Sequence, residues 1–323
     1  MRSNPISHHK HIRKTMLAII YYIILAIACL AVLILSAIMV VVLRPFDPAR
    51  HCIHELSRLL TKIFFGWPRW RKITRGVEKI DRKQPYVITI NHTSMVDIPM
   101  LYRIPLNFRW VSKREVFRIP FFGQMLTLHG DICIDRSSSS AMAKVTTLGK
   151  KWINRGASIA IFPEGTRSKD GEIHRFKSGA FSLAKEAGVP ILPVVLHGSD
   201  TLFANGWRLP WRHTFRIEVL DPIPADVVAS MEIKELSEMV REKMVAAKEM
   251  LKNMNWWLIG AFGVTTLLTL VAIYMPGLSS VFGIEAGTFE TKELLISIAL
   301  ALSIIPIFEI GKAISRAAHK KAQ

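Results

Sequence analysis

Cysteine is scarce in this sequence, and its scarcity excludes two kinds of site. The chain has 323 residues and only 3 cysteines, Cys29, Cys52 and Cys133. Because these three are odd in number and widely spaced, they form neither a disulfide framework nor a set of paired metal ligands. We expect ordinary reduced thiols, and the sequence implies no metal or redox cofactor.

Acidic residues are also few relative to basic ones. The sequence has 43 Lys and Arg against 25 Asp and Glu, a formal net charge of +18. This excess fits a phosphate-bearing substrate, an anionic lipid surface or nucleic acid. The basic residues flank long apolar runs and lie among Trp and Phe, as in a protein that rests on lipid headgroups. We therefore expect membrane phospholipids as a partner and no nucleic acid.

Charge is absent from one long run near the start of the chain. Residues 15–43 contain no Asp, Glu, Lys or Arg, and the run exceeds the roughly 20 residues that span a bilayer as a helix. It is also longer than the apolar part of a signal peptide, about 7 to 15 residues. We interpret residues 15–44 as a membrane helix that follows a basic tail, residues 1–14. Basic residues on both sides leave two arrangements open, a spanning helix and a helix lying obliquely in one leaflet.

Two shorter apolar runs lie near the other end of the chain. Residues 256–275 and 294–308 predict a transmembrane helical hairpin over 255–311, followed by a basic tail, 312–323. The loop between them holds one basic residue, Lys292, whereas both outer flanks are rich in Lys and Arg. We therefore expect both flanks, and the domain before them, to face the cytoplasm.

The pattern changes between residues 45 and 254, where we expect one catalytic domain. Short β-branched runs predict strands, and runs with apolar residues at helical spacing predict helices between them. The expected strands are PYVITI, ASIAIF, PILPVVL and TFRIEVL, and the expected helices are MAKVTTLGKKWINR, GAFSLAKEAG and IKELSEMVREKMVAAKEMLKNM. Strands that alternate with helices predict an α/β domain with a mostly parallel sheet flanked by helices.

A histidine and an aspartate follow the first expected strand. PYVITI runs directly into NHTSMVD, so Asn91, His92 and Asp97 lie at the carboxyl end of a strand, where open α/β sheets place their sites. A carboxylate that accepts the Nδ1 proton of a histidine leaves Nε2 free to act as a general base. By itself the pair is also typical of a surface or capping contact.

Two further polar turns follow apolar runs. IAIFPEGTRS carries Glu164, Gly165, Thr166 and Arg167, where a glycine lets the backbone approach a ligand and an arginine matches phosphate oxygens. The alternative is a polar turn in which Glu164 and Arg167 pair with each other. GDICIDR ends on Arg136, which is equally compatible with a solvated loop residue.

Together these motifs resemble the lysophosphatidic acid acyltransferase family (1-acylglycerol-3-phosphate acyltransferases) within the glycerolipid acyltransferases. Four family blocks occur in order over roughly residues 70–225: NHTSMVD, GDICIDR, FPEGTRS and VPILPVV. The resemblance implies that His92 is the base and that Asp97 orients it. It further implies a substrate-binding set made of Asn91, Lys113, Arg136, Glu164, Gly165, Thr166, Arg167, Lys177, Val189, Pro190 and Pro193.

The resemblance implies transfer of a fatty acyl group from acyl-CoA or acyl carrier protein to the sn-2 hydroxyl of lysophosphatidic acid. The product would be phosphatidic acid, in phospholipid synthesis. Direct transfer is favoured over an acyl-enzyme, because no GxSxG nucleophile motif is present. A different acceptor such as a lyso-ornithine lipid or another lysophospholipid, a non-catalytic lipid-binding membrane protein, and a hydrolase stay open. The absence of organelle-targeting signals favours a bacterial inner membrane.

Overall fold

The computed structural model describes residues 5–43, 45–67, 70–135, 140–203 and 209–252. Its helices are α1 (Pro5–Leu43), α2 (His51–Phe64), α3 (Asp97–Leu101), α4 (Arg114–Phe117), α5 (Phe122–His129), α6 (Ala141–Ile153), α7 (Gly179–Ala187), α8 (Ala225–Ser230) and α9 (Ile233–Lys252), with a 3₁₀ turn at Val77–Lys79. Its strands are β1 (Trp70–Arg75), β2 (Val87–Ile90), β3 (Phe108–Lys113), β4 (Ile132–Ile134), β5 (Ser158–Ile161), β6 (Ile191–His197) and β7 (His213–Val219). The predicted hairpin, 255–311, lies outside the described residues.

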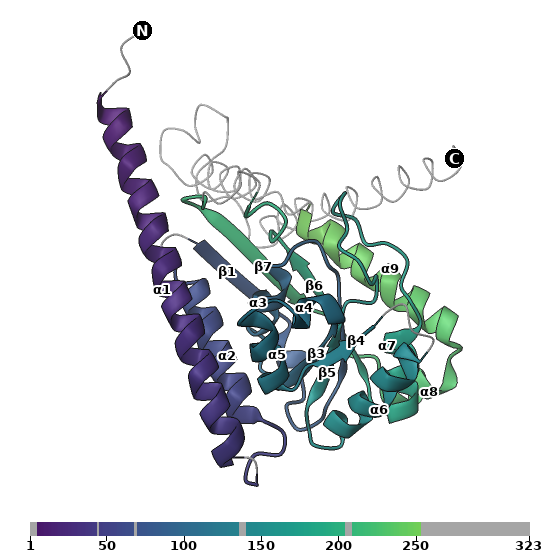
Figure 1. Cartoon of the computed structure of the whole chain (residues 1–323). Helices are drawn as coiled ribbons and strands as arrows, with labels where there is room; N and C mark the ends of the chain where they lie inside the picture. The colour runs from purple at the N-terminus through teal and green to yellow at the C-terminus, as the bar shows by residue number, and fades with distance from the viewer. Residues whose placement is uncertain (1–4, 44, 68–69, 136–139, 204–208, 253–323) are drawn as a thin grey trace, which may run out of the picture. The chain divides into compact units, whose positions relative to one another are not determined.

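The strands form one mixed sheet in the order β1-β7-β6-β2-β5-β3-β4 (Figure 1). The strands from β6 to β4 run parallel, whereas β7 is antiparallel to β6 and pairs in parallel with β1. The expected α/β sheet flanked by helices is therefore confirmed. Its first, third and fourth strands were not expected from the sequence, and the β1–β7 pair makes one side of the sheet run in the opposite direction.

Helices cover both faces of the sheet, which explains why the central strand is apolar on both sides. All four residues of β2 are 0% exposed. Ile88 and Ile90 belong to a core that includes Met100 and Leu101 of α3, whereas Val87 belongs to a second core lined by α6, α7 and α9. The sequence of a strand buried on both faces is a nearly continuous hydrophobic run. VITI, with a single threonine, fits this pattern.

Helix α1 packs lengthwise against α2 and α5 (Figure 1). Its segment Thr15–Leu43 is long and apolar enough to cross a bilayer, with a mean hydropathy of 3.2 in its most apolar window. One side of it, marked by Ala18, Val32 and Ser36, is buried against the domain. The other side exposes large apolar side chains along the whole segment, from Met16 to Val42. The helix is therefore two-sided, although both sides consist mainly of apolar residues.

Beneath α2 and α5 lies a buried polar cluster made of His54, His129, Asp131 and Arg109. His129 Nδ1 lies 2.7 Å from Asp131 Oδ1, and His129 Nε2 lies 3.1 Å from His54 Nδ1 and 3.2 Å from Arg109 Nη1. Since an arginine can only donate, His129 Nε2 accepts and His129 Nδ1 donates to Asp131. This assignment makes His129 neutral and His54 Nδ1 a donor to it. Burial, the largest influence, lowers the pKa of both His54 and His129.

The cluster predicts a loss of stability in acid. A histidine whose pKa is lowered by folding supports the fold above its unfolded pKa, ordinarily 6.5, and that support is lost as the pH falls below this value. We expect the thermal unfolding midpoint to drop as the pH is lowered from about 6.5. His54→Phe, which keeps a ring between Tyr102 and Phe108, should make the drop shallower. An unfolding midpoint with the same pH dependence in both proteins would contradict this account.

Candidate active site

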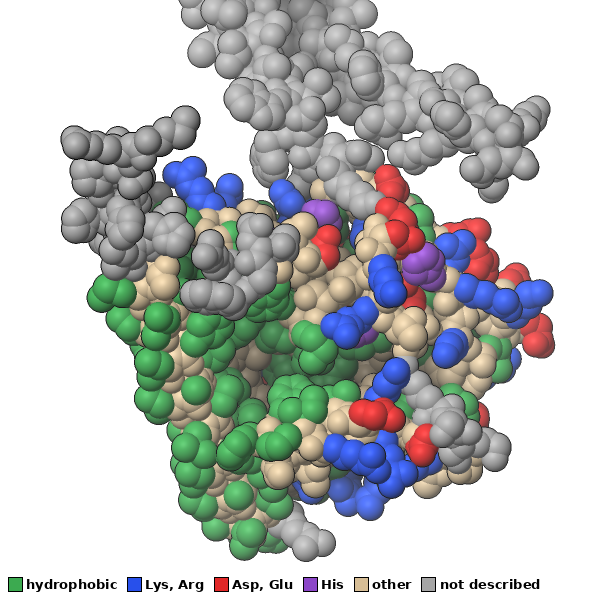
Figure 2. All heavy atoms as spheres, turned by 45° about the horizontal axis from the view of Figure 1, so that its top comes forward, with side chains coloured by type: hydrophobic (Ala, Val, Ile, Leu, Met, Phe, Trp, Pro, Cys, Tyr) green, Lys and Arg blue, Asp and Glu red, His purple; other side chains and the backbone are tan. Residues whose placement is uncertain are grey.

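The candidate site lies at the carboxyl edge of the three central parallel strands. Loops that follow β2, β5 and β6 meet there, because these strands are neighbours and point in the same direction. Figure 2 shows the molecule with the top of Figure 1 tilted toward the viewer. Hydrophobic side chains cover the left part of this face, where α1 lies, and Lys and Arg side chains are spread mainly over the right and the lower centre. This edge is where the sequence predicted the reacting groups.

Asn91 joins two of these strands at the start of the loop. Its side-chain Nδ2 donates to the carbonyl of Leu196 at 3.0 Å, and its Oδ1 accepts the Leu196 N–H at 2.8 Å. Asn91 is 0% exposed, so its amide is committed to β6. The sequence predicted that Asn91 binds substrate. In the structure its side chain ties the loop to β6 and so positions the next residue, His92.

His92 and Asp97 form the predicted pair. The His92 Nδ1 atom lies 2.9 Å from Asp97 Oδ2, and the two side chains are 14% and 0% exposed. Because a carboxylate can only accept, Nδ1 carries the proton of the neutral imidazole and Nε2 carries the lone pair. Among the described residues no hydrogen bond reaches Nε2, which leaves this atom available to a substrate.

The carboxylate of Asp97 holds the loop together as well as the ring. Its Oδ2 also accepts the backbone N–H groups of Thr93, at 2.7 Å, and Ser94, at 2.8 Å. Its Oδ1 accepts the hydroxyl of Ser199, which follows β6, and Ser199 Oγ lies 3.0 Å from Thr93 Oγ1. These donors replace the water that a buried carboxylate has lost.

An aromatic stack fixes the plane of the His92 ring. Phe162, the residue after β5, lies parallel to His92 with ring centroids 3.8 Å apart and an interplanar angle of 14°. Trp110 of β3 stacks on the other face of Phe162 at 5.0 Å. The imidazole is therefore restrained both at Nδ1, by Asp97, and across its face, by Phe162.

Glu164 connects the third block to the first. Its Oε1 accepts the backbone N–H of His92 and its Oε2 that of His174, both at 3.0 Å. The side chain is buried, 6% exposed, and burial raises its pKa even though the two N–H groups act in the opposite direction. The sequence left open an ion pair between Glu164 and Arg167. No such ion pair occurs among the described residues, and Arg167 is exposed.

The remaining predicted binding residues divide into a polar rim and a buried strand. Thr166, Arg167 and Lys177 are exposed beside Gly165. Gly165 has a positive φ of 77°, which a side chain would strain, and a Cβ there would lie 3.0 Å from the Lys177 side chain. Lys113 is exposed at the end of β3. By contrast, three residues of the fourth block lie in the core at or before β6: Val189, Pro190 and Pro193. Arg136 lies outside the described residues.

The sequence did not single out Ser199 or Phe162, although Ser199 comes shortly after an expected strand and Phe162 is the last residue of another, ASIAIF. Each lies just past the carboxyl end of a strand that neighbours β2. A search for polar or aromatic residues at the ends of all expected parallel strands would have found them. No group of three or more His, Cys, Asp or Glu with the geometry of a metal site occurs in the part of the chain that the structure describes.

Comparison with family models gives two matches. The model described as Acyltransferase matches residues 72–197, which contain His92, Asp97 and the turn at Glu164. The model described as Cation transporting ATPase, C-terminus, matches residues 237–314. Within the described part of that second match, Val240 and Met244 of α9 are fully buried in the core shared with α6 and α7.

Curated relatives carry the name 1-acyl-sn-glycerol-3-phosphate acyltransferase. A putative enzyme of this name from Caenorhabditis elegans, acl-2, is 36% identical over 57% of this chain and 67% of its own length. The human alpha form is 30% identical over 60% of this chain and 68% of its own. The chloroplastic LPAT1 of Arabidopsis thaliana is 30% identical over 60% of this chain, which spans only 56% of that longer protein.

A solved structure has the same fold. The crystal structure of the 1-acyl-sn-glycerophosphate acyltransferase PlsC from Thermotoga maritima superposes with a TM-score of 0.63 at 24% identity. The match covers 76% of this chain and 98% of that one. The sheet and its flanking helices therefore have a close counterpart of known architecture.

Replacement of Glu164 tests its bridging role. Glu164→Gln replaces one of two acceptors with a donor, so either the His92 or the His174 N–H must lose its partner. A buried N–H left unsatisfied costs about 1 to 3 kcal/mol, and we expect the thermal unfolding midpoint to fall. Glu242→Gln, at an exposed position of α9, is the matched control. Equal midpoints for the two variants would argue against the bridge.

Proposed function

Because this chain belongs to the 1-acyl-sn-glycerol-3-phosphate acyltransferase family, we propose that it transfers a fatty acyl group from a thioester to the sn-2 hydroxyl of lysophosphatidic acid, which gives phosphatidic acid. The observation that carries the proposal is the His92–Asp97 pair, with a 2.9 Å contact at Nδ1 and an unengaged Nε2 among the described residues. A histidine oriented in this way can take a proton from an alcohol near neutral pH.

The reaction proceeds in one transfer without an acyl-enzyme. His92 Nε2 removes the proton of the acceptor hydroxyl while its oxygen attacks the thioester carbonyl, and a tetrahedral oxyanion forms. The oxyanion collapses, the carbon–sulfur bond breaks, and the imidazolium returns the proton to the departing thiolate. Asp97 stays a carboxylate throughout and stabilises the imidazolium, while the stack on Phe162 keeps the ring from turning away.

The polar rim supplies the charge that the substrates require. Lysophosphatidate and both expected thioester donors, acyl-CoA and acyl carrier protein, are anionic, and exposed cations flank the turn after β5. Arg167 offers a planar fork of donors suited to phosphate, and Lys177 lies against the backbone of Gly165. We assign Arg167, Lys177, Lys113 and Arg136 to phosphate recognition, with Thr166 beside them and Gly165 providing room for the ligand.

The buried members of the binding set act indirectly. Asn91 and Glu164 hold the His92 loop to β6 and to the turn after β5. Pro193 pairs with Thr89 across the centre of the sheet, and Val189 and Pro190 precede the same strand. We assign these residues to positioning of the site, and β6 to the wall beside which the acyl chain lies.

The exposed apolar side of α1 supports a membrane location. The contacts with α2 and α5 and the buried residues Ala18, Val32 and Ser36 lie on one side of the helix, so a bilayer reaches mainly the other side. This favours the arrangement in which α1 lies along one leaflet, with both of its basic flanks on the same side of the membrane. It also keeps the site near the leaflet that contains the lysolipid acceptor. A bacterial inner membrane, with the domain in the cytoplasm, is part of the proposal.

The first test is transfer of a labelled acyl group to lysophosphatidic acid by the purified protein in detergent. We expect labelled phosphatidic acid from the wild type, and His92→Ala should lower the rate by about 100- to 10,000-fold, because it removes the general base. His51→Ala, at an exposed position of α2, is the matched control. Labelled free fatty acid in place of phosphatidic acid would indicate a hydrolase. Absence of any acylated product, with all lysolipids and both donors, would favour a lipid-binding protein.

Ser199 gives a second test of the same machinery. Ser199→Ala removes the donor on Asp97 Oδ1, and the loss of a hydrogen bond to a charged group, about 1.5 to 3 kcal/mol, should lower kcat by about 10- to 100-fold. Because Ser199 is 0% exposed and acts through Asp97, KM should change little. Ser199→Thr, which keeps the hydroxyl, should restore most of the rate. An equal loss in both variants would indicate a packing role instead.

A further inference from the structure

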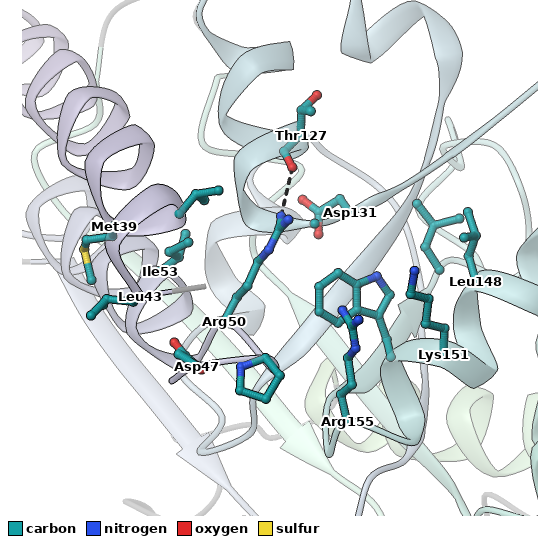
Figure 3. Close-up of a pocket in the computed structure, with 15 residues that line it drawn as sticks. Met39, Leu43, Asp47, Arg50, Ile53, Thr127, Asp131, Leu148, Lys151 and Arg155 are labelled. Atoms are coloured by element: carbon teal, nitrogen blue, oxygen red, sulfur yellow. Dashed lines mark hydrogen bonds between the residues drawn. The ribbon is translucent and has the colours of Figure 1, made fainter. Parts of the chain in front are cut away.

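A second cavity lies at the opposite edge of the sheet from His92. It has a volume of about 560 Å³ and opens between the last turns of α1, the loop into α2, and helices α5 and α6 (Figure 3). Its lining includes Ile132, the first residue of β4, so the cavity adjoins the amino ends of the parallel strands. No residue assigned above to the acyl-transfer site lines it.

One wall of the cavity is apolar and continues the lipid-facing side of α1. Met39, Val40 and Leu43 contribute from α1, and Leu148 faces them from α6 (Figure 3). The neighbouring residues Val41 and Val42 of α1 are 76% and 60% exposed. An acyl chain in contact with the outer side of α1 therefore has an apolar path around the end of the helix and into the cavity.

The other wall is cationic and is built around an indole ring. The Arg155 and Arg50 guanidinium carbons lie 5.2 Å and 5.4 Å from the ring centroid of Trp152, and Lys151 lies beside them (Figure 3). Arg50 Nη1 donates to the carbonyls of Thr127 and Leu128, at 3.1 Å and 2.7 Å, so Arg50 is anchored to the end of α5. Lys151 and Arg155 are exposed.

Two carboxylates also line the cavity, and three of their four oxygens accept hydrogen bonds from the protein. Asp47 accepts the N–H groups at the start of α2, from His51 and Cys52, each at 2.8 Å. Asp131 Oδ1 accepts the Trp110 N–H at 2.8 Å and bonds to the neutral His129. Asp131 Oδ2 is buried and has no hydrogen-bond partner among the described residues. The charged groups that are exposed toward a ligand are therefore those of Lys151 and Arg155.

We propose that this cavity binds an anionic glycerophospholipid of the membrane, at a site separate from the acyl-transfer site. The phosphate lies on Lys151 and Arg155, and the start of an acyl chain lies along Met39, Val40 and Leu43. The volume is within the range of pockets that bury small ligands, about 300 to 1,000 Å³. The occupant holds α1 against α6 and so ties the lipid-facing helix to the catalytic domain.

Photo-crosslinking of the full chain in phosphatidylcholine nanodiscs tests the proposal. The probe is phosphatidylglycerol with a diazirine on its acyl chain, and a phosphatidylcholine with the same diazirine is the headgroup control. We expect adducts on peptides that contain residues 39–43 or 148–155, and far fewer with the zwitterionic probe. Lys151→Gln with Arg155→Gln should lower the adduct yield by about tenfold or more, because each basic residue at a lipid surface adds attraction to an anionic headgroup.

Matched variants separate this site from general surface charge and from the catalytic site. Lys144→Gln with Lys150→Gln removes the same charge from exposed positions of α6 that do not line the cavity, and should leave the yield unchanged. Leu148→Trp keeps every charge but fills the cavity, and should abolish the adducts if the lipid enters it. His92→Ala should not change them.

Three results would overturn the proposal. Equal labelling by the two probes would mean that the cavity does not select an anionic headgroup. Equal losses in the two double variants would assign the effect to the charge of α6 as a whole. Loss of labelling when inorganic phosphate replaces chloride at equal ionic strength would indicate a site for free phosphate, whereas labelling that persists supports a site for a lipid.

Discussion

The carboxylate of Asp97 is buried without a water shell, and the geometry of the site depends on how the protein replaces that shell. Backbone N–H groups from its own loop, the imidazole of His92 and the hydroxyl of Ser199 surround it. Each donor comes from a segment whose place is set by the sheet: the loop by β2, and Ser199 by β6. A displacement of either strand would leave part of a negative charge uncompensated in the interior, where such a charge is most costly. The sheet order and the catalytic geometry are therefore parts of one constraint.

The same constraint explains why several polar residues of the segments that follow β2, β5 and β6 are buried. Asn91, Glu164 and Ser199 have no exposed role in the structure, because their side chains satisfy backbone or side-chain groups around His92. The exposed residues that we propose for phosphate recognition, Arg167 and Lys177, form an outer layer. In the proposed mechanism the inner layer fixes where a proton is accepted, and the outer layer selects the anion that is held there. This division lets substrate choice vary without disturbance of the proton-accepting group.

The sequence was most informative where the local pattern coincides with a structural need. PYVITI predicted a strand, whose residues VITI the structure shows to be fully buried, and NHTSMVD predicted a reacting pair because it follows that strand directly. β1 and β4 were missed for physical reasons: WRKITR carries three basic residues on a strand at the edge of the sheet, and β4 has only three residues, ICI. Ser199 was missed because its partner, Asp97, is 102 residues away in the chain, and only the pairing of β6 with β2 brings them together. Composition also could not distinguish the two sides of α1, since Ala18 and Val32 are as apolar as the residues on the outer side.

That two-sidedness has a practical consequence for the handling of the protein. A detergent micelle normally encircles a transmembrane helix, but around α1 only the side that the domain leaves open can accept detergent. Small, strongly penetrating detergents compete with the domain for the inner side of α1, where Ala18 and Val32 are buried. Tyr21, whose hydroxyl bonds to the carbonyl of Phe64, is one polar contact that detergent tails cannot replace. Purification in mild detergents with bulky headgroups should therefore keep α1 packed on the domain. Harsher detergents should detach α1 and leave the rest of the domain folded.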